Sequence, residues 1–91
     1  MAFYRCTIWQ ADGTLVAKEV DVSVETVDRE GKEAWHGTIT ASHRAPLEAG
    51  KQYRLELGDG RKGAFMVQRN TFAGGENRAI SIRGMGPLAS A

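Results

Sequence analysis

The feature that most constrains this chain is an alternation of apolar and polar side chains with a period of two residues. Its clearest example is VDVSV at residues 20–24, where three valines alternate with an aspartate and a serine. Such an alternation places apolar side chains on one face of a β-strand and polar side chains on the other. The one candidate for an amphipathic helix, residues 45–53, is interrupted by Gly50. We therefore expect an all-β fold.

Six segments with this alternation are separated by residues that favour turns, and each is expected to form a short strand. They are residues 3–10, 14–27, 34–41, 52–58, 63–69 and 78–84. Strands that follow one another through tight turns pair antiparallel, as in a meander. The sheet can hide its two edges by closing as a six-stranded small barrel or by rolling into a sandwich.

Two further features concern the extent and curvature of this sheet. Gly37 and Gly63 fall on inward positions, where a strongly bent small barrel needs room. A chain of 91 residues is long enough for one domain. We expect a single small β domain over residues 1–91, in which residues 83–91 form a partly ordered tail that Leu88 anchors.

The glycine-rich stretch GDGRKG at residues 58–63 raises three possibilities: a calcium loop, a phosphate-binding loop and a turn. A calcium loop needs several oxygen ligands, but Asp59 is the only carboxylate in residues 57–75. A phosphate-binding loop opens a helix and has Ser or Thr after its lysine, whereas Lys62 precedes a glycine and a strand. We interpret the stretch as a two-residue hairpin turn of type I′ with Asp59 and Gly60 at its centre.

Charge is nearly balanced, because 12 basic and 11 acidic side chains give a net charge of +1. Residues 1–45 carry 7 acidic and 5 basic side chains, and residues 46–91 carry 4 acidic and 7 basic ones. A net charge this small gives no strong field towards nucleic acid or a membrane. The single cysteine, the polar residues near the N-terminus and the lack of an apolar run of about 18 residues predict a cytoplasmic protein without membrane contact.

Few residues are candidates for catalysis or metal binding. Cys6 and His43 could form a nucleophile–base pair, and His36 is the other histidine. Cys6 belongs to the apolar side of its strand, where a free cysteine usually acts as a small hydrophobe. The cysteine and histidines lack the short paired spacings that are typical of zinc sites. We therefore expect no catalytic residue, no metal and no cofactor.

The turns and loops offer two candidate binding surfaces, because successive connections of a meander alternate between its two ends. His43, Arg44 and Phe72 are expected at one end, and Arg61 and Lys62 at the other.

Charges along the strands offer surfaces of a second kind. Glu19, Asp21 and Glu25 form an acidic stripe, and the later strands carry the basic residues Arg54, Lys62, Arg69, Arg78 and Arg83. The usual meaning of such charges is a solvated face with cross-strand pairs. A sharper interpretation sets the basic side of one molecule against the acidic side of another, or against a nucleic-acid backbone. The uncharged strip formed by Ala64, Met66 and Gln68 is a candidate contact with a second subunit.

Three pieces of the sequence together resemble short bacterial β-barrel proteins of unassigned function. The pieces are W-x-G at residues 35–37, Y-x-L-x-L-x-D-G-R-x-G at residues 53–63 and G-x-G-x-L at residues 84–88. They consist of turn glycines and core positions. The resemblance therefore implies a β-barrel fold and brings no catalytic residues with it.

Together these observations predict a non-catalytic binding or assembly module whose partner is another protein or a second copy of the chain. One alternative is a small β-barrel that binds nucleic acid through its basic second half, with Arg61 and Arg78 among the contacts. The other is a small enzyme that uses Cys6 or His43.

Overall fold

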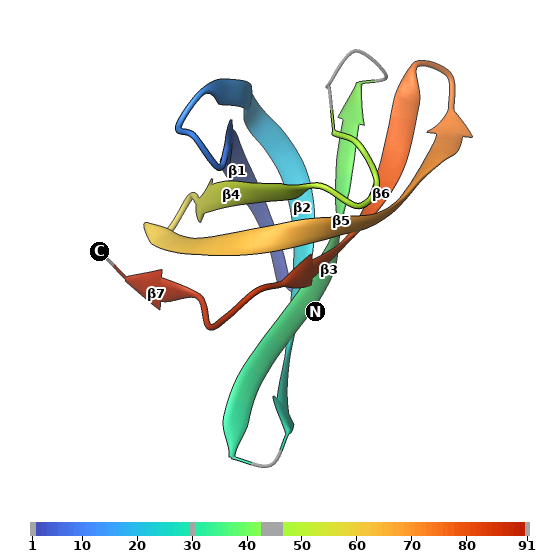
Figure 1. The fold of residues 1–91 in the computed structure, drawn as a ribbon. Helices are drawn as coiled ribbons and strands as arrows, with labels where there is room; N and C mark the ends of the chain where they lie inside the picture. Colours follow the sequence, from blue (N-terminus) through green and yellow to red (C-terminus); the bar gives the residue numbers. More distant parts are fainter. Residues whose placement is uncertain (1, 30, 43–46, 91) are drawn as a thin grey trace.

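The computed structural model describes residues 2–29, 31–42 and 47–90, and Figure 1 shows how they are arranged. The described residues form strands, turns and short irregular segments, and none of them is helical. The strands are β1 (Ala2–Gln10), β2 (Leu15–Arg29), β3 (Lys32–Ser42), β4 (Gln52–Leu57), β5 (Arg61–Gly74), β6 (Asn77–Gly84) and β7 (Ala89–Ser90). The all-β prediction is confirmed.

The six longer strands form one antiparallel sheet that closes in a ring. Neighbours follow the order β4–β1–β2–β3–β6–β5, and β5 pairs with β4 to complete the circle. Two runs of consecutive strands, β1–β2–β3 and β4–β5–β6, follow the predicted meander. Between these runs the chain passes from β3 to the free edge of β1, so that β4 pairs with β1 and β6 pairs with β3. In this circular order β2 lies across the ring from β5, and β3 lies across from β4.

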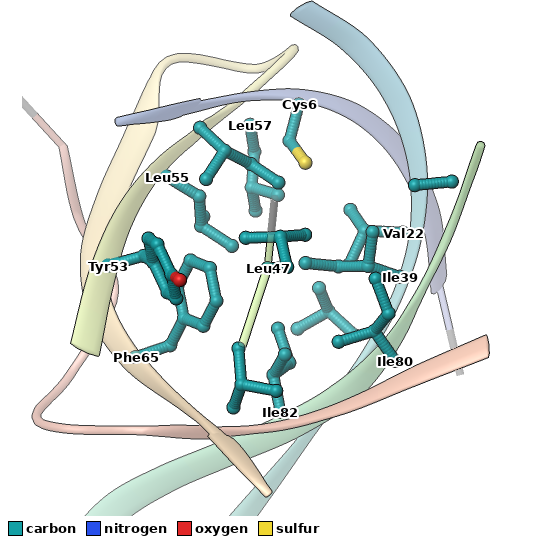
Figure 2. Close-up of a cluster of buried hydrophobic side chains, with 14 of the residues drawn as sticks. Cys6, Val22, Ile39, Leu47, Tyr53, Leu55, Leu57, Phe65, Ile80 and Ile82 are labelled. Atoms are coloured by element: carbon teal, nitrogen blue, oxygen red, sulfur yellow. The ribbon is translucent and has the colours of Figure 1, made fainter. Parts of the chain in front are cut away.

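The inside of the ring is filled by apolar side chains, which point inward from the surrounding strands in Figure 2. The buried hydrophobic residues are Cys6, Ile8, Val22, Val24, Trp35, Ile39, Ala41, Leu47, Tyr53, Leu55, Leu57, Phe65, Val67, Ile80, Ile82 and Leu88. On the strands these are the residues that the period of two placed on the inner face. No polar or charged residue in the described part of the chain is buried with them.

Leu47 fills the middle of the ring, although it belongs to no strand (Figure 2). Its side chain is only 2% exposed. The segment that follows is held against the sheet by backbone hydrogen bonds, from Gly50 N to the carbonyl oxygen of Val67 at 2.8 Å and from Val67 N to that of Lys51 at 3.0 Å. The connection before β4 therefore contributes a core residue as well as linking two strands.

Two of the inward glycines occupy places where a side chain would collide with its surroundings. A Cβ atom on Gly63 would lie 2.9 Å from Leu88 Cδ2 and 3.2 Å from Trp35 Cζ2. A Cβ atom on Gly37 would overlap the backbone carbonyl of Ser23. The expectation that these glycines leave room inside a closely bent sheet is confirmed.

The GDG stretch forms the turn between β4 and β5, but its type differs from the expectation. Gly60 N donates to the carbonyl oxygen of Leu57 at 2.9 Å, and Gly60 has a φ of 95°. Asp59 has no positive φ, so the type I′ assignment is wrong. A glycine in the left-handed region after the turn is typical of three-residue hairpin loops. The carboxylate of Asp59 accepts a hydrogen bond from Arg61 N at 3.1 Å, which closes the loop.

The β5–β6 hairpin is longer than the sequence indicated. Residues 70–77 were expected to form a loop, but β5 continues to Gly74 and β6 begins at Asn77. The additional part of β5 is paired with β6, for example at Thr71 and Ala79. Beyond β6, Leu88 packs in the core and β7 pairs with the first two residues of β5.

Candidate binding face on the outside of β4 and β5

The described residues that the sequence proposed for binding lie at two ends of the ring, which agrees with the two separate surfaces that the meander predicted. Arg61 and Lys62 begin β5, next to the β4–β5 turn. Phe72 and Arg78 stand opposite one another in the β5–β6 hairpin, at the far end of the same strand. The two groups therefore lie at different ends of the ring and do not form one site.

Arg61 is held within the fold and is not a free cation. Its Nε atom donates to the Asp59 carboxylate at 2.9 Å, and its Nη2 atom donates to the hydroxyl oxygen of Tyr4 at 2.8 Å. The guanidinium carbon lies 5.3 Å from the centre of the Tyr4 ring. The hydrogen bonds from Arg61 also lower the pKa of Asp59. These contacts tie the β4–β5 turn to β1, so Arg61 acts as a structural residue.

Arg78 has a similar structural role at the other end. Its Nε and Nη2 atoms donate to the side-chain oxygen and the backbone carbonyl of Asn70, at 2.8 and 2.9 Å. The amide nitrogen of Asn70 donates in turn to the carbonyl oxygen of Leu47 at 2.7 Å. Arg78 therefore fixes Asn70, and Asn70 fixes the backbone of the residue that fills the ring.

Phe72 is the exposed member of this end, with 69% of its surface accessible. It lies on β5 and not in a loop. Its expected companions His43 and Arg44 lie outside the described residues. The described part of this end consequently shows one exposed aromatic ring beside an arginine that is already engaged.

A different set of side chains meets on the outside of β1, β4 and β5. Trp9 stands opposite Arg54, and Arg54 stands opposite Ala64, in one row across the three strands. Inward neighbours such as Leu55 are buried, which fixes the row on the outer face. Leu15 opposite Trp9 extends the row in one direction, and Met85 next to Ala64 extends it in the other.

This row borders a shallow hollow of about 440 Å³ on the outer surface. Its lining consists of Trp9, Gly13, Arg54, Leu55, Lys62, Gly63 and Ala64. Trp9, Ala64 and the adjacent Met66 are half-buried, whereas Arg54 and Lys62 are exposed. We call the outer surface formed by Trp9, Arg54, Lys62, Ala64 and Met66 the β4–β5 face.

The two cations of the β4–β5 face have no partner within the described chain. Neither Arg54 nor Lys62 makes a side-chain hydrogen bond or an ion pair with any residue in the ranges that the structure describes. Glu56 shares this outer face: it stands opposite Lys62 on β5 and follows Arg54 by two positions on β4. No ion pair forms between Glu56 and either cation within 4.0 Å. Both cations are thus available to an external carboxylate.

Sequence reasoning found part of this face. The uncharged strip around Met66 was expected to face outward, and Trp9 lies on the outer side of β1 by the same parity. The neighbourhood of Trp9 and Arg54 was missed because these residues meet only through the pairing of β1 with β4. No local sequence pattern indicates that pairing, because it depends on the closure of the ring.

The geometry offers no nucleophile at Cys6. The Cys6 side chain is 3% exposed, and burial raises the pKa of its thiol to about 12, with a smaller contribution from Asp21. His36 lies on the outer face of β3, where its Nε2 atom is 3.4 Å from a carboxylate oxygen of Glu25. Cys6 and His36 thus point to opposite sides of the sheet. The second histidine, His43, lies outside the described residues.

In residues 2–29, 31–42 and 47–90, no three His, Cys, Asp or Glu side chains are grouped so that they could hold a metal ion. No helix that could span a bilayer occurs in those residues. The chain matches no protein-family model, no curated protein and no solved structure, so its resemblance to short bacterial β-barrel proteins stays a prediction.

Proposed function

We propose that this chain is a non-catalytic protein-binding module, and that its β4–β5 face binds an acidic surface of a partner. The observation that carries this proposal is the pair of unpartnered cations, Arg54 and Lys62, beside the half-buried ring of Trp9 in one hollow. Tryptophan and arginine are among the side chains most enriched in the energetic centres of protein interfaces, and methionine is enriched in interfaces as a whole.

The chemistry of the hollow suits a carboxylate next to an apolar contact. The guanidinium of Arg54 can donate two parallel hydrogen bonds to one carboxylate, and Lys62 can add a third. Trp9, Ala64 and Met66 supply apolar surface around these charges. Three paired strands hold these positions, so binding costs little ordering of the backbone.

Nucleic acid is the second candidate partner of the same face. A base can stack on Trp9 while Arg54 and Lys62 contact phosphates. Glu56 argues against this partner, because its carboxylate lies on the same outer face, next to both cations. A polyanionic backbone would be repelled there. A protein surface can instead offer a donor to Glu56 and carboxylates to the cations.

Affinity capture with matched variants tests this proposal. The tagged wild-type chain is compared with Arg54→Gln/Lys62→Gln and with the control Lys18→Gln/Arg69→Gln, which removes the same charge elsewhere. We expect a defined protein from a nuclease-treated extract of the native organism to bind the wild type and the control. This protein should bind Arg54→Gln/Lys62→Gln much more weakly, and it should dissociate from the wild type as the salt concentration is raised.

A fluorescent single-stranded oligonucleotide serves as the second arm. If the wild type retains the oligonucleotide only through Arg54 and Lys62 while no captured protein depends on these residues, the partner of the β4–β5 face is nucleic acid and not a protein. Equal capture of the same proteins by all three forms would show that the β4–β5 face is not the binding surface.

A further inference from the structure

The side of the ring opposite the β4–β5 face carries charges of the other sign. In the circular strand order β2 and β3 lie across from β5 and β4. In Figure 1, β5 accordingly runs in front of β2 and β3, and β4 runs in front of β2. Three carboxylates lie on outward positions of β2, and all are exposed: Glu19, Asp21 and Glu25. We call this surface the β2 side.

The carboxylates of the β2 side are weakly engaged within the chain. Asp21 lies 3.7 Å from Arg5, and both side chains are more than 70% exposed. Glu25 lies 3.4 Å from His36 in a pair that is about half exposed. Exposed pairs of this kind contribute little to stability and exchange readily with other partners.

Glu19 is the most available carboxylate of the three. It makes no ion pair or side-chain hydrogen bond with the described residues. Lys18 and Glu19 stand together opposite Thr7 of β1, because β2 has one residue more than β1 at this point. Both side chains are exposed at this bulge. Lys18, together with Arg5 beside Asp21, brings two positive charges to a surface that carries three negative ones.

We propose that the partner of the β4–β5 face is a second copy of this chain, bound through its β2 side. This inference rests on the proposed function and identifies the protein that the β4–β5 face binds. Arg54 and Lys62 of one copy would meet Glu19 and its acidic neighbours in the next copy. Each chain thus carries both halves of the contact, on opposite sides of the ring.

Symmetry favours this arrangement over a two-fold dimer through the β4–β5 face alone. A two-fold axis would gather four cations, Arg54 and Lys62 of both copies, around only two carboxylates, Glu56 of each copy, and this excess of positive charge is repulsive. A contact between two different surfaces has no such conflict. It leaves one free surface at each end, so copies add head to tail until the chain of copies closes or stops.

The surface of the chain is large enough for both contacts. A stable interface covers roughly 800 Å² on each partner. The whole accessible surface of the chain is 5798 Å². Two separate patches of the usual size would leave most of the surface exposed.

Sedimentation of the full chain tests the inference with two neutralising variants. Arg54→Gln/Lys62→Gln removes the basic half of the contact, and Glu19→Gln/Glu25→Gln removes the acidic half. The wild type should show an average mass that rises with concentration beyond that of a dimer at low salt and falls at high salt. Each variant alone should remain a monomer. Unchanged circular dichroism and urea midpoints would show that both variants are folded.

An equal mixture of the two variants is the decisive sample. One variant keeps an intact β2 side and the other keeps an intact β4–β5 face, so the mixture should form a one-to-one dimer and grow no further. The control Lys51→Gln/Arg69→Gln, which removes two positive charges outside both surfaces, should assemble like the wild type. A neutralising change that leaves assembly intact, or a mixture that stays monomeric, overturns the inference.

Failure of the inference can be told apart from failure of the proposed function. A wild type that stays monomeric at high concentration and low salt removes the second copy as the partner. If affinity capture still finds a protein that requires Arg54 and Lys62, the β4–β5 face is a binding surface for a different protein. If neither experiment depends on these cations, both proposals fall.

Discussion

The indole N–H of Trp35 donates a hydrogen bond of 2.7 Å to the carbonyl oxygen of Gly86, although 51 positions separate the two residues in the chain. The bond ties β3 to the segment that follows β6. Gly63 and Gly84 pack directly against the same indole ring. All three motif pieces in the resemblance to short bacterial β-barrel proteins therefore meet at Trp35, which gives those pieces a structural role.

Replacement of Gly84 by alanine should destabilise the protein. A Cβ atom at this position would overlap the five-membered ring of the Trp35 indole, which is enclosed in the core. Overpacking of this kind costs about 1–3 kcal/mol in free energy of unfolding, measurable by urea denaturation. Gly58→Ala is the matched control, because its Cβ would lie 3.4 Å from the carbonyl oxygen of Arg5, an ordinary contact. Equal losses in both variants would contradict the proposed overlap.

Truncation of Leu47 should show that the connection before β4 is part of the core. Leu47→Ala removes a side chain from the middle of the ring, and a change of this type costs about 2–5 kcal/mol. Leu15→Ala makes the same chemical change at a position that is 47% exposed, where a loss below about 1 kcal/mol is expected. The two unfolding free energies are compared under the same conditions. Similar values would mean that Leu47 does not support the ring.

Most strand positions could be predicted because alternation is a local property of the sequence. The strand expected at 52–58 runs from Gln52 to Leu57, and its inward residues are those that the period of two selected. The length of β5 could not be predicted in the same way. Its last part, residues 70–74, lacks alternation and is extended because β6 pairs with it.

The features that sequence reasoning missed are non-local. Leu47 is an isolated apolar residue in a connection, and nothing periodic marks it as central. Trp9 and Arg54 become neighbours only when β4 pairs with β1. Arg61 and Arg78 looked like free cations because their partners, Tyr4 and Asn70, are supplied by the folded structure. The pairing of β1 with β4 brings Trp9 to Arg54 and Arg61 to Tyr4, whereas Arg78 and Asn70 meet within the β5–β6 hairpin.

Arg78 should matter for stability through the geometry of its guanidinium. Arg78→Lys keeps the charge but loses the two hydrogen bonds to Asn70, which should lower the unfolding free energy by about 1–2 kcal/mol. Arg69→Lys is the matched control on the neighbouring strand. Arg69 makes no ion pair or side-chain hydrogen bond with the described residues, so a change within about 0.5 kcal/mol is expected. If Arg78→Lys leaves the unfolding free energy unchanged, Arg78 is again a candidate for ligand binding.

Cys6 should make the stability of the protein depend on pH above the usual thiol range. The pKa of its thiol is raised from 9.0 to about 12, chiefly by burial. Above pH 9 the unfolded chain loses the thiol proton while the folded chain keeps it.

Deprotonation in that range therefore favours unfolding, by about 1.4 kcal/mol per pH unit at most. Below pH 9 the thiol should contribute a constant amount. Cys6→Ala lacks the titrating group, so the stability difference between wild type and variant should be constant to pH 9 and then shift against the wild type. Urea denaturation of both proteins from pH 7 to pH 10.5 measures this difference. A difference that stays constant over the whole range, or rapid reaction of the folded protein with a thiol reagent at pH 8, would mean that Cys6 is not enclosed in the ring.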